Sequence, residues 1–206
     1  MEATLAPRIR QKPNRLNIPN YLVYEVLDGK PIYFQGYKDV LNHKKTKEEV
    51  MATGRLQTLI ISTLQEHLWA NHNQAGLKYM SNEVGIHIAT GLNFSCDLVA
   101  FDKNALAATE DDTHYYTIPP KFVIEIDTNG DFSDAIFEDY LFKKSKRLLT
   151  FGAEKVIWIL TASKTVTVGT PDGTFITHDW DRPIEIFKGQ PIVLADLFKE
   201  NGIKIA

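Results

Sequence analysis

Cysteine is almost absent from this sequence, since Cys96 is the only one in 206 residues. A single cysteine excludes an intrachain disulfide, which fits the reducing cytoplasm. No apolar run reaches the roughly 20 residues that a membrane-spanning helix needs. The first twenty residues, MEATLAPRIRQKPNRLNIPN, also lack the apolar centre of a secretory signal. We therefore expect a cytoplasmic protein without a membrane segment.

An excess of basic charge is missing as well. The chain has 23 Lys and Arg against 26 Asp and Glu, for a formal net charge of −3. Proteins that grip DNA by its phosphates usually show a basic balance or a basic patch. The overall charge therefore gives no support to nucleic-acid binding, although a bound divalent metal would make a local groove more positive.

The length and the hydrophobic pattern indicate one globular domain. With 44% hydrophobic and 24% charged residues the composition is ordinary, and 206 residues are enough to bury one sizeable core. Residues 1–20 contain three prolines and no hydrophobic period. We expect a flexible arm at 1–20 and a single domain at 21–206.

Hydrophobic periodicity predicts an α/β (α+β) fold. Residues 21–33 have the pattern of a β-hairpin that turns at Asp28-Gly29, and residues 46–69 that of one long helix. A loop is predicted at 103–118 and a short helix at 193–200. Strands are predicted at 78–80, 83–89, 95–101, 121–127, 155–161, 164–168 and 174–178.

The strand at 121–127 and the helix after it carry the most informative polar residues. Alternation along the strand places Glu125 and Asp127 on one face, opposite Phe122, Ile124 and Ile126. In the helix, Lys144 falls inside the apolar stripe, within roughly 20° of Phe137 and 40° of Leu148. A charge directed toward the core needs a partner, and the two acids are the nearest candidates.

Asp97 is a third acid in an apolar strand. Alternation along 95–101 places it with Val99 and Phe101, opposite Cys96, Leu98 and Ala100. A buried carboxylate must be paired, hydrogen-bonded or bound to a metal. Asp97, Glu125 and Asp127 are hard oxygen ligands without a Cys/His zinc spacing nearby, which favours Mg²⁺ or Mn²⁺. A metal and a lysine are the equipment of phosphodiester hydrolysis.

The same residues also suit a structural role. Asp127 would then cap the following turn, Lys144 would extend toward water, and the acids would form a buried ion-pair network. Spacing alone does not separate this alternative from a metal site.

Several segments, taken in order, carry a resemblance to a known family. They are the hairpin, the long helix, SNEVGI at 81–86, CDLVAFD at 96–102, PPKFVIEI at 119–126 and FGAEKVIWIL at 151–160. This order resembles the Uma-two family of predicted restriction endonucleases, which belongs to the PD-(D/E)XK nuclease superfamily. The resemblance implies a restriction-endonuclease-like mixed β-sheet flanked by helices, and Mg²⁺-dependent cleavage of DNA.

The resemblance also implies the site residues. Asp97 matches the motif aspartate and Glu125 the motif glutamate. The superfamily lysine normally stands two residues after that glutamate, where this chain has Asp127. In the Uma-two pattern the lysine lies on the following helix, and Lys144 takes that place. Cys96 replaces the motif proline, and Asp127-Thr128-Asn129 replaces a hydrophobic-Ser-Pro segment.

Two hypotheses about function follow. The first is a Mg²⁺-dependent (or Mn²⁺-dependent) endonuclease that hydrolyses DNA. In it, Asp97 and Glu125 hold the metal, Asp127 assists them, and Lys144 orients or activates the attacking water. The second is a catalytically silent module of the same fold that acts as a binding or regulatory protein, as the negative charge and the altered motif suggest.

A few other residues have no assigned role or a weaker one. An apolar strip of Phe142 and Leu149, opposite the core stripe of the lysine helix, predicts a homodimer. The polar residues whose roles stay open are Glu49, Gln57, Glu83 and Lys143.

Overall fold

The computed structural model describes residues 18–72, 76–109, 113–127, 130–131, 137–187 and 189–204. Most of the predicted arm at 1–20 lies outside these residues, so that prediction and the single-domain boundary stay predictions. No helix in the described part of the chain is both long and apolar enough to cross a membrane.

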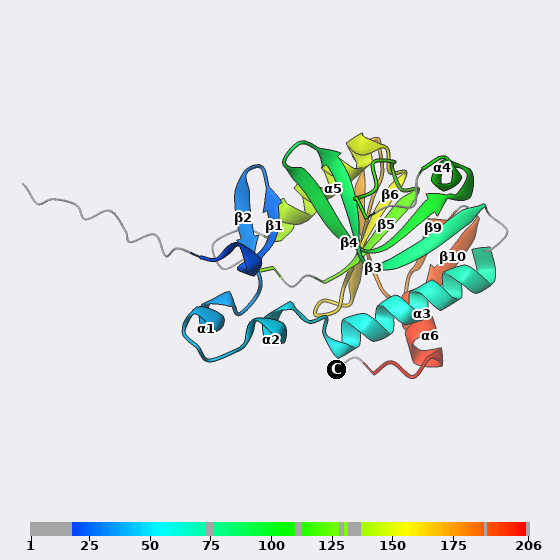
Figure 1. Ribbon diagram of the computed structural model, residues 1–206. Helices are drawn as coiled ribbons and strands as arrows, with labels where there is room; N and C mark the ends of the chain where they lie inside the picture. Colours follow the sequence, from blue (N-terminus) through cyan, green and yellow to red (C-terminus); the bar gives the residue numbers. More distant parts are fainter. Residues whose placement is uncertain are drawn as a thin grey trace, which may run out of the picture.

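A six-stranded sheet forms the centre of the molecule (Figure 1). Its spatial order follows the chain: β3 (Leu77–Ala89), β4 (Leu92–Asp102), β5 (Phe122–Ile126), β6 (Lys155–Leu160), β7 (Thr165–Gly169) and β8 (Phe175–Asp179). Only β5 and β6 are parallel, and all other neighbours are antiparallel. A parallel pair needs a crossover connection, which α5 (Phe137–Phe151) provides.

One face of the sheet is covered by α3 (Arg55–His72) together with the C-terminal segment. That segment forms the hairpin β9 (Pro183–Phe187) and β10 (Gln190–Val193), followed by α6 (Leu194–Glu200). Ile60, Leu64 and Leu68 of α3 pack in one cluster with apolar residues of β5 and α6. This helix therefore presents one apolar stripe to the core.

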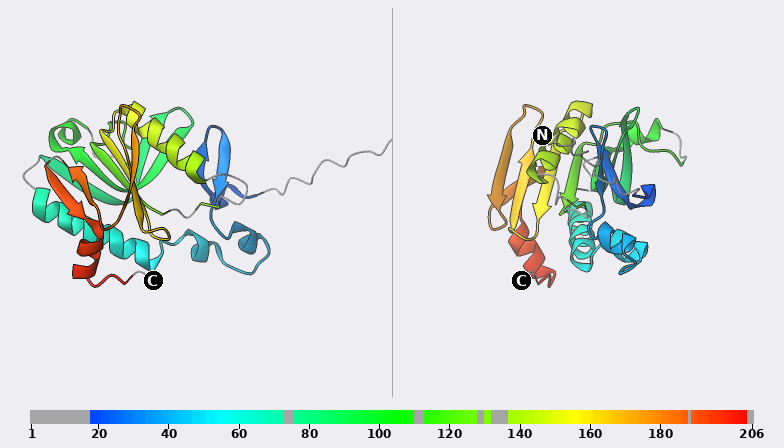
Figure 2. Two further views of the ribbon diagram at one scale, coloured as in Figure 1. Left: turned by 180° about the vertical axis from the view of Figure 1, so that it is seen from behind. Right: turned by 90° about the vertical axis from the view of Figure 1, so that its left-hand side faces the viewer.

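The other face is covered by α5 and by the N-terminal hairpin, which lies at one end of the sheet (Figure 2). The hairpin consists of β1 (Val23–Leu27) and β2 (Lys30–Tyr33), and it turns at Asp28 and Gly29, which have φ angles of 52° and 73°. A short 3-10 turn (Asn20–Leu22), α1 (Tyr37–Leu41) and α2 (Lys47–Met51) share a small cluster beside it. The predicted mixed sheet, flanking helices and N-terminal hairpin are confirmed.

Four local predictions need correction. The helix expected at 46–69 is two helices, because the chain is extended at Ala52 and the poor helix formers Thr53 and Gly54 follow. The strands at 78–80 and 83–89 are one strand, β3, with a bulge at positions 82 and 83. The loop at 103–118 begins with α4 (Lys103–Ala107), capped by the Asp102 side chain. The β9–β10 hairpin was not predicted.

The apolar strip that suggested a homodimer is only partly on the surface. Leu149 is buried in the core between α5 and the sheet. Phe142 is 39% exposed, and its ring lies edge-on to Phe175 at 4.8 Å between centroids. The surface argument for a dimer is weaker than predicted, and the oligomeric state stays a prediction.

A matched pair of leucines in α3 tests the assignment of the core. Leu64 is fully buried, whereas Leu59 is 43% exposed on the same helix. Leu64→Ala should lower the free energy of unfolding by about 2–5 kcal/mol, because it leaves a cavity. Leu59→Ala should change it by less than about 0.5 kcal/mol. Urea unfolding measures both, and equal effects would contradict the packing described above.

Candidate active site

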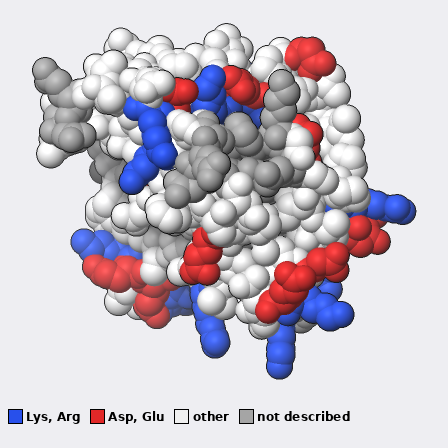
Figure 3. All heavy atoms as spheres, turned by 90° about the vertical axis from the view of Figure 1, so that its right-hand side faces the viewer, with Lys and Arg blue, Asp and Glu red and all other residues white. Residues whose placement is uncertain are grey.

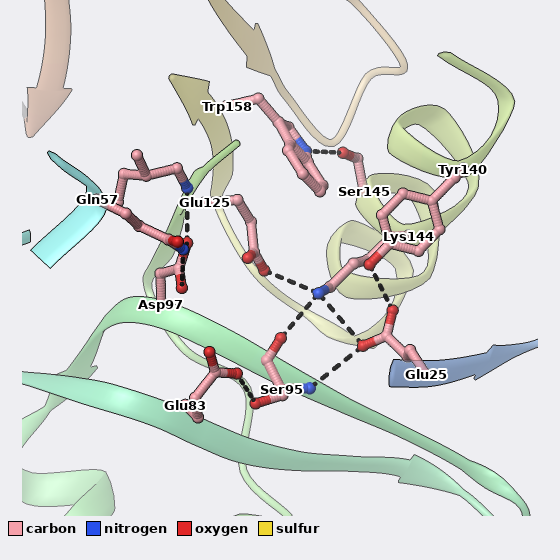
Figure 4. A network of polar contacts seen from close by, with 11 residues as sticks. Glu25, Gln57, Glu83, Ser95, Asp97, Glu125, Tyr140, Lys144, Ser145 and Trp158 are labelled. Carbon is pink, nitrogen blue, oxygen red and sulfur yellow. Dashed lines mark hydrogen bonds and ion pairs between the residues drawn. The ribbon is translucent and has the colours of Figure 1, made fainter. Parts of the chain in front are cut away.

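Lys144 lies in the middle of α5 and has no exposed surface. Its ammonium contacts Glu125 Oε1 at 3.1 Å and Glu25 Oε1 at 3.3 Å, and it donates a hydrogen bond to the Ser95 carbonyl at 2.8 Å (Figure 4). The rings of Phe94, Tyr140 and Trp158 lie 5.6–5.9 Å from the same nitrogen. The sequence prediction that Lys144 points inward and reaches Glu125 is confirmed.

Glu125 occupies the position that strand alternation predicts. It stands on β5, the central strand with a parallel neighbour, and is 2% exposed. Ile124 and Ile126 pack on the α3 side of the sheet, so Glu125 faces α5 and Lys144. Its Oε1 atom has the ammonium as an ion-pair partner at 3.1 Å but makes no hydrogen bond of good geometry.

Glu25 is the site residue that sequence reasoning missed. It is 6% exposed on β1, and its carboxylate accepts hydrogen bonds from the Tyr140 hydroxyl at 2.6 Å and the Ser95 N–H at 3.3 Å. A signal was present, because Glu25 shares a strand face with buried Leu27. An acid at an otherwise apolar position of the hairpin predicts a buried carboxylate that needs a partner.

Asp97 lies close to these residues but not where strand alternation placed it. Gln57 of α3 donates its amide to both Asp97 oxygens at 3.1 Å, and the Ile126 N–H donates to one of them at 2.7 Å. Asp97 is therefore not grouped with Val99 and Phe101, which pack on the α5 side. The bulge in β3 shifts the pairing between Cys96 and Leu98 and interrupts the alternation there.

Asp127 does not join the contacts around Lys144. The residue has a φ angle of 50° and follows the end of β5, so the strand alternation stops before it. Its carboxylate accepts hydrogen bonds from the Thr161 N–H at 2.7 Å and the Thr161 hydroxyl at 2.6 Å. The expectation that Asp127 lies beside Glu125 is wrong, and its role as a metal ligand stays a prediction.

The four polar residues with open roles differ in position. Gln57 fixes Asp97, and Glu83 accepts a hydrogen bond from the Ser95 hydroxyl beside the site. Glu49 completes a capping box with Thr46 at the start of α2. Lys143 forms an ion pair with Asp139 at 2.7 Å on the surface of α5. Only the first two therefore border the candidate site.

Burial and neighbouring charges shift the pKa values of this group. Burial opposes a charged Lys144, but Glu125 and Glu25 outweigh it and hold the lysine pKa well above its usual range. The pKa of Glu125 is raised to about 8: burial is the largest cause, the charge of Lys144 acts against it, and the charges of Asp97 and Glu25 add to it. The pKa of Asp97 is likewise raised to about 6, mainly by burial, although the hydrogen bond from the Ile126 N–H lowers it. Two neighbouring carboxylates thus share a site that disfavours two negative charges.

The donor atoms suit a hard divalent cation. Among the described residues no group of three or more His, Cys, Asp or Glu side chains is arranged to hold a metal. Mg²⁺, however, is commonly held by one or two carboxylates, water and a substrate phosphate. Asp97 and Glu125 supply two such carboxylates. Burial raises the pKa of both, and the charge of Asp97 raises that of Glu125 as well, so a bound cation would relieve the repulsion between them.

Comparison with known proteins establishes the fold. A crystal structure of a candidate nuclease belonging to DUF820, from Anabaena variabilis, aligns with a TM-score of 0.63 and 18% sequence identity, over 85% of this chain and 89% of that chain. No protein-family model and no curated protein matches the sequence. The chain thus shares its fold with that candidate nuclease, and the Uma-two assignment stays a prediction.

The raised pKa of Glu125 predicts how stability depends on pH without metal. The unfolded chain releases this proton near 4.5 and the folded chain near 8, so the folded form binds more protons between these values. The free energy of unfolding should therefore fall as pH rises from about 5 to 8, by about 1.4 kcal/mol per unit of pKa shift at most. Asp97 acts with the same sign at lower pH.

Urea unfolding in EDTA across this pH range measures the effect. Glu125→Gln removes the titrating group and should make the free energy of unfolding less dependent on pH. Glu154→Gln replaces an exposed acid that is paired with Lys121, and it should leave the pH dependence unchanged. A wild-type protein that gains stability from pH 5 to 8 would contradict the assignment.

Proposed function

We propose that this protein hydrolyses phosphodiester bonds in DNA with Mg²⁺ or Mn²⁺. The observation that carries the proposal is the fully buried Lys144 ammonium, held 3.1 Å from Glu125 with Asp97 close by. The fold shared with a candidate nuclease supports it, and so does the resemblance of the same residues to the Uma-two pattern.

Each residue would have a distinct task. Asp97 and Glu125 would hold the metal, which when bound lowers the pKa of a coordinated water and polarises a phosphoryl oxygen. Gln57 and the Ile126 N–H fix the Asp97 carboxylate from two directions. Lys144 would orient the attacking water or stabilise negative charge that develops on the phosphate. Asp127 would assist from the turn that follows β5.

The surface charge is compatible with a local rather than a global nucleic-acid footprint. On the face shown in Figure 3, basic and acidic side chains are interspersed and leave wide uncharged areas. The described residues on that face therefore form no continuous basic stripe of the kind a DNA-binding groove shows. On α5, the exposed Lys143 and Arg147 are already paired with acids, Lys143 with Asp28 and Asp139 and Arg147 with Asp28.

A silent module of the same fold is the second candidate. Its supporting observation is that no three His, Cys, Asp or Glu side chains among the described residues are arranged to hold a metal, and that the Lys144 ammonium is already paired with Glu25 and Glu125. Such a protein would bind nucleic acid or another partner without cleaving it. Its Mn²⁺ affinity, measured by calorimetry, would not depend on Glu125.

A cleavage assay with two adjacent lysines tests the leading proposal. Purified protein with Mg²⁺ or Mn²⁺ should cut plasmid or single-stranded DNA, and EDTA should stop it. Lys144→Met and Asp97→Asn should each lower the rate by about 100-fold or more, because they remove transition-state stabilisation or a metal ligand. Lys143→Met, one position away on the exposed face of α5, should leave the rate within about threefold.

Asp127→Asn separates the catalytic from the structural role of that acid, because it removes the charge and keeps an acceptor for Thr161. A rate near that of the wild type would assign it to the turn. Intact DNA under all metal conditions, or equal rates for Lys144→Met and Lys143→Met, would overturn the proposal.

A further inference from the structure

The Glu25 carboxylate of the hairpin is bound by three donors that come from the body of the protein, meaning the central sheet and α5. The Lys144 ammonium lies 3.3 Å from Oε1, the Ser95 N–H donates to the same oxygen at 3.3 Å, and the Tyr140 hydroxyl donates to Oε2 at 2.6 Å. Lys144 and Tyr140 come from α5, and Ser95 comes from β4 (Figure 4). Glu25 alone comes from the hairpin.

These three donors suit an anion with two oxygens on one centre. A cationic N–H, a hydroxyl and a backbone N–H are the groups that bind phosphate in proteins, and a carboxylate accepts the same donors. The position also adjoins the candidate catalytic group, because the ammonium that contacts Glu25 lies 3.1 Å from Glu125. An anion in place of Glu25 would share Lys144 with Glu125.

The site as it stands is closed. Lys144 has no exposed surface, and Glu25, Asp97 and Glu125 are all buried. The hairpin makes its own two-stranded sheet, and among the described residues its strands have no backbone pairing with the six-stranded sheet. Its polar links to the body include the side-chain contacts at Glu25 and at Asp28, and a backbone hydrogen bond that the Asp131 N–H donates to the Tyr33 carbonyl at 2.6 Å, outside the central sheet. A carboxylate can therefore be withdrawn without breaking the central sheet.

A surface pocket of about 540 Å³ borders this position on the side of Glu25 and Ser95. Its lining includes both Glu25 and Ser95, together with Asn20, Tyr24, Asn93 and Tyr115. Tyr115 is 53% exposed, and aromatic side chains at such a surface give unpaired bases a stacking partner. A nucleic-acid strand in this pocket would place its backbone beside the Glu25 carboxylate.

We propose that Lys144, Tyr140 and the Ser95 N–H form the binding position for a substrate phosphate, and that Glu25 of the β1–β2 hairpin occupies it as an internal anion until nucleic acid displaces it. The identity of the anion as a phosphodiester rests on the proposed function. The hairpin is then an autoinhibitory element, and the structure represents the closed form.

DNA binding by two charge-matched hairpin variants tests this proposal. The probe is a fluorescein-labelled 12-base-pair duplex, with fluorescence anisotropy measured in EDTA so that no cleavage occurs. Glu25→Gln removes the internal anion, whereas Asp28→Asn removes one negative charge at the turn of the same hairpin and frees Lys143 and Arg147. We expect Glu25→Gln to bind at least about tenfold more tightly than Asp28→Asn. Equal affinities would overturn the proposal.

Glu25→Asp keeps the test decisive if the Gln variant does not fold. It preserves the charge of the hairpin but draws the carboxylate back by one methylene, so that it no longer reaches Lys144 and Tyr140 together. We expect a smaller gain in DNA affinity than for Glu25→Gln, in the same direction. An unchanged or weaker affinity in folded Glu25→Asp would overturn the proposal.

Lysine acetylation distinguishes an occupied phosphate position from a loosened hairpin. In the wild type, acetic anhydride should modify exposed Lys143 and spare Lys144, as measured by mass spectrometry. In Glu25→Gln, Lys144 should become reactive, and the duplex should protect it again. If the duplex leaves Lys144 reactive while it binds, the anion lies elsewhere and the proposal fails.

The outcomes separate this proposal from the proposed function. A gain in affinity specific to Glu25→Gln, without cleavage by any variant in Mg²⁺ or Mn²⁺, would support the phosphate position and remove the nuclease assignment. Cleavage by the wild type, with equal affinities of the two hairpin variants, would support the nuclease and remove the phosphate position.

Discussion

The buried ammonium of Lys144 is the constraint on which the arrangement of this molecule depends. A charge taken out of water costs several kcal/mol unless it is paired and hydrogen-bonded. Lys144 meets that condition with Glu125 from β5, Glu25 from β1 and the Ser95 carbonyl from β4. One side chain of α5 thereby joins the central sheet to the N-terminal hairpin. The same contacts leave Glu125 beside Asp97 at the inner end of a closed site.

Stability alone does not explain why this buried site contains a lysine and several carboxylates. Apolar residues of similar volume can replace a buried ion pair with little loss of stability, so the pair alone says little about why the charges are there. Here two carboxylates with raised pKa values adjoin a single lysine, and such clusters are commonest at functional sites. The amide of Gln57 and the N–H of Ile126 also fix Asp97 in one orientation. Both features favour a catalytic reading.

The parts of the site that follow regular secondary structure could be predicted from the sequence. Glu125 lies within an unbroken strand and Lys144 within an unbroken helix, so the two periodicities gave their directions correctly. Asp97 and Asp127 lie where regularity ends, at a bulge in the paired strand and at a residue with a φ angle of 50°. The contact of Glu25 with Lys144 depends on how the hairpin docks on α5, and no local pattern encodes that docking.

The most direct measurement is a crystal structure of the protein soaked in Mn²⁺, with data collected at the manganese absorption edge. The site proposed for Asp97 and Glu125 predicts one strong anomalous peak in contact with an oxygen of each carboxylate, and its loss in Glu125→Gln. A peak bound by Asp127 instead, or a structure with no peak and Lys144 still paired with both glutamates at saturating Mn²⁺, would contradict the metal site and with it the proposed chemistry.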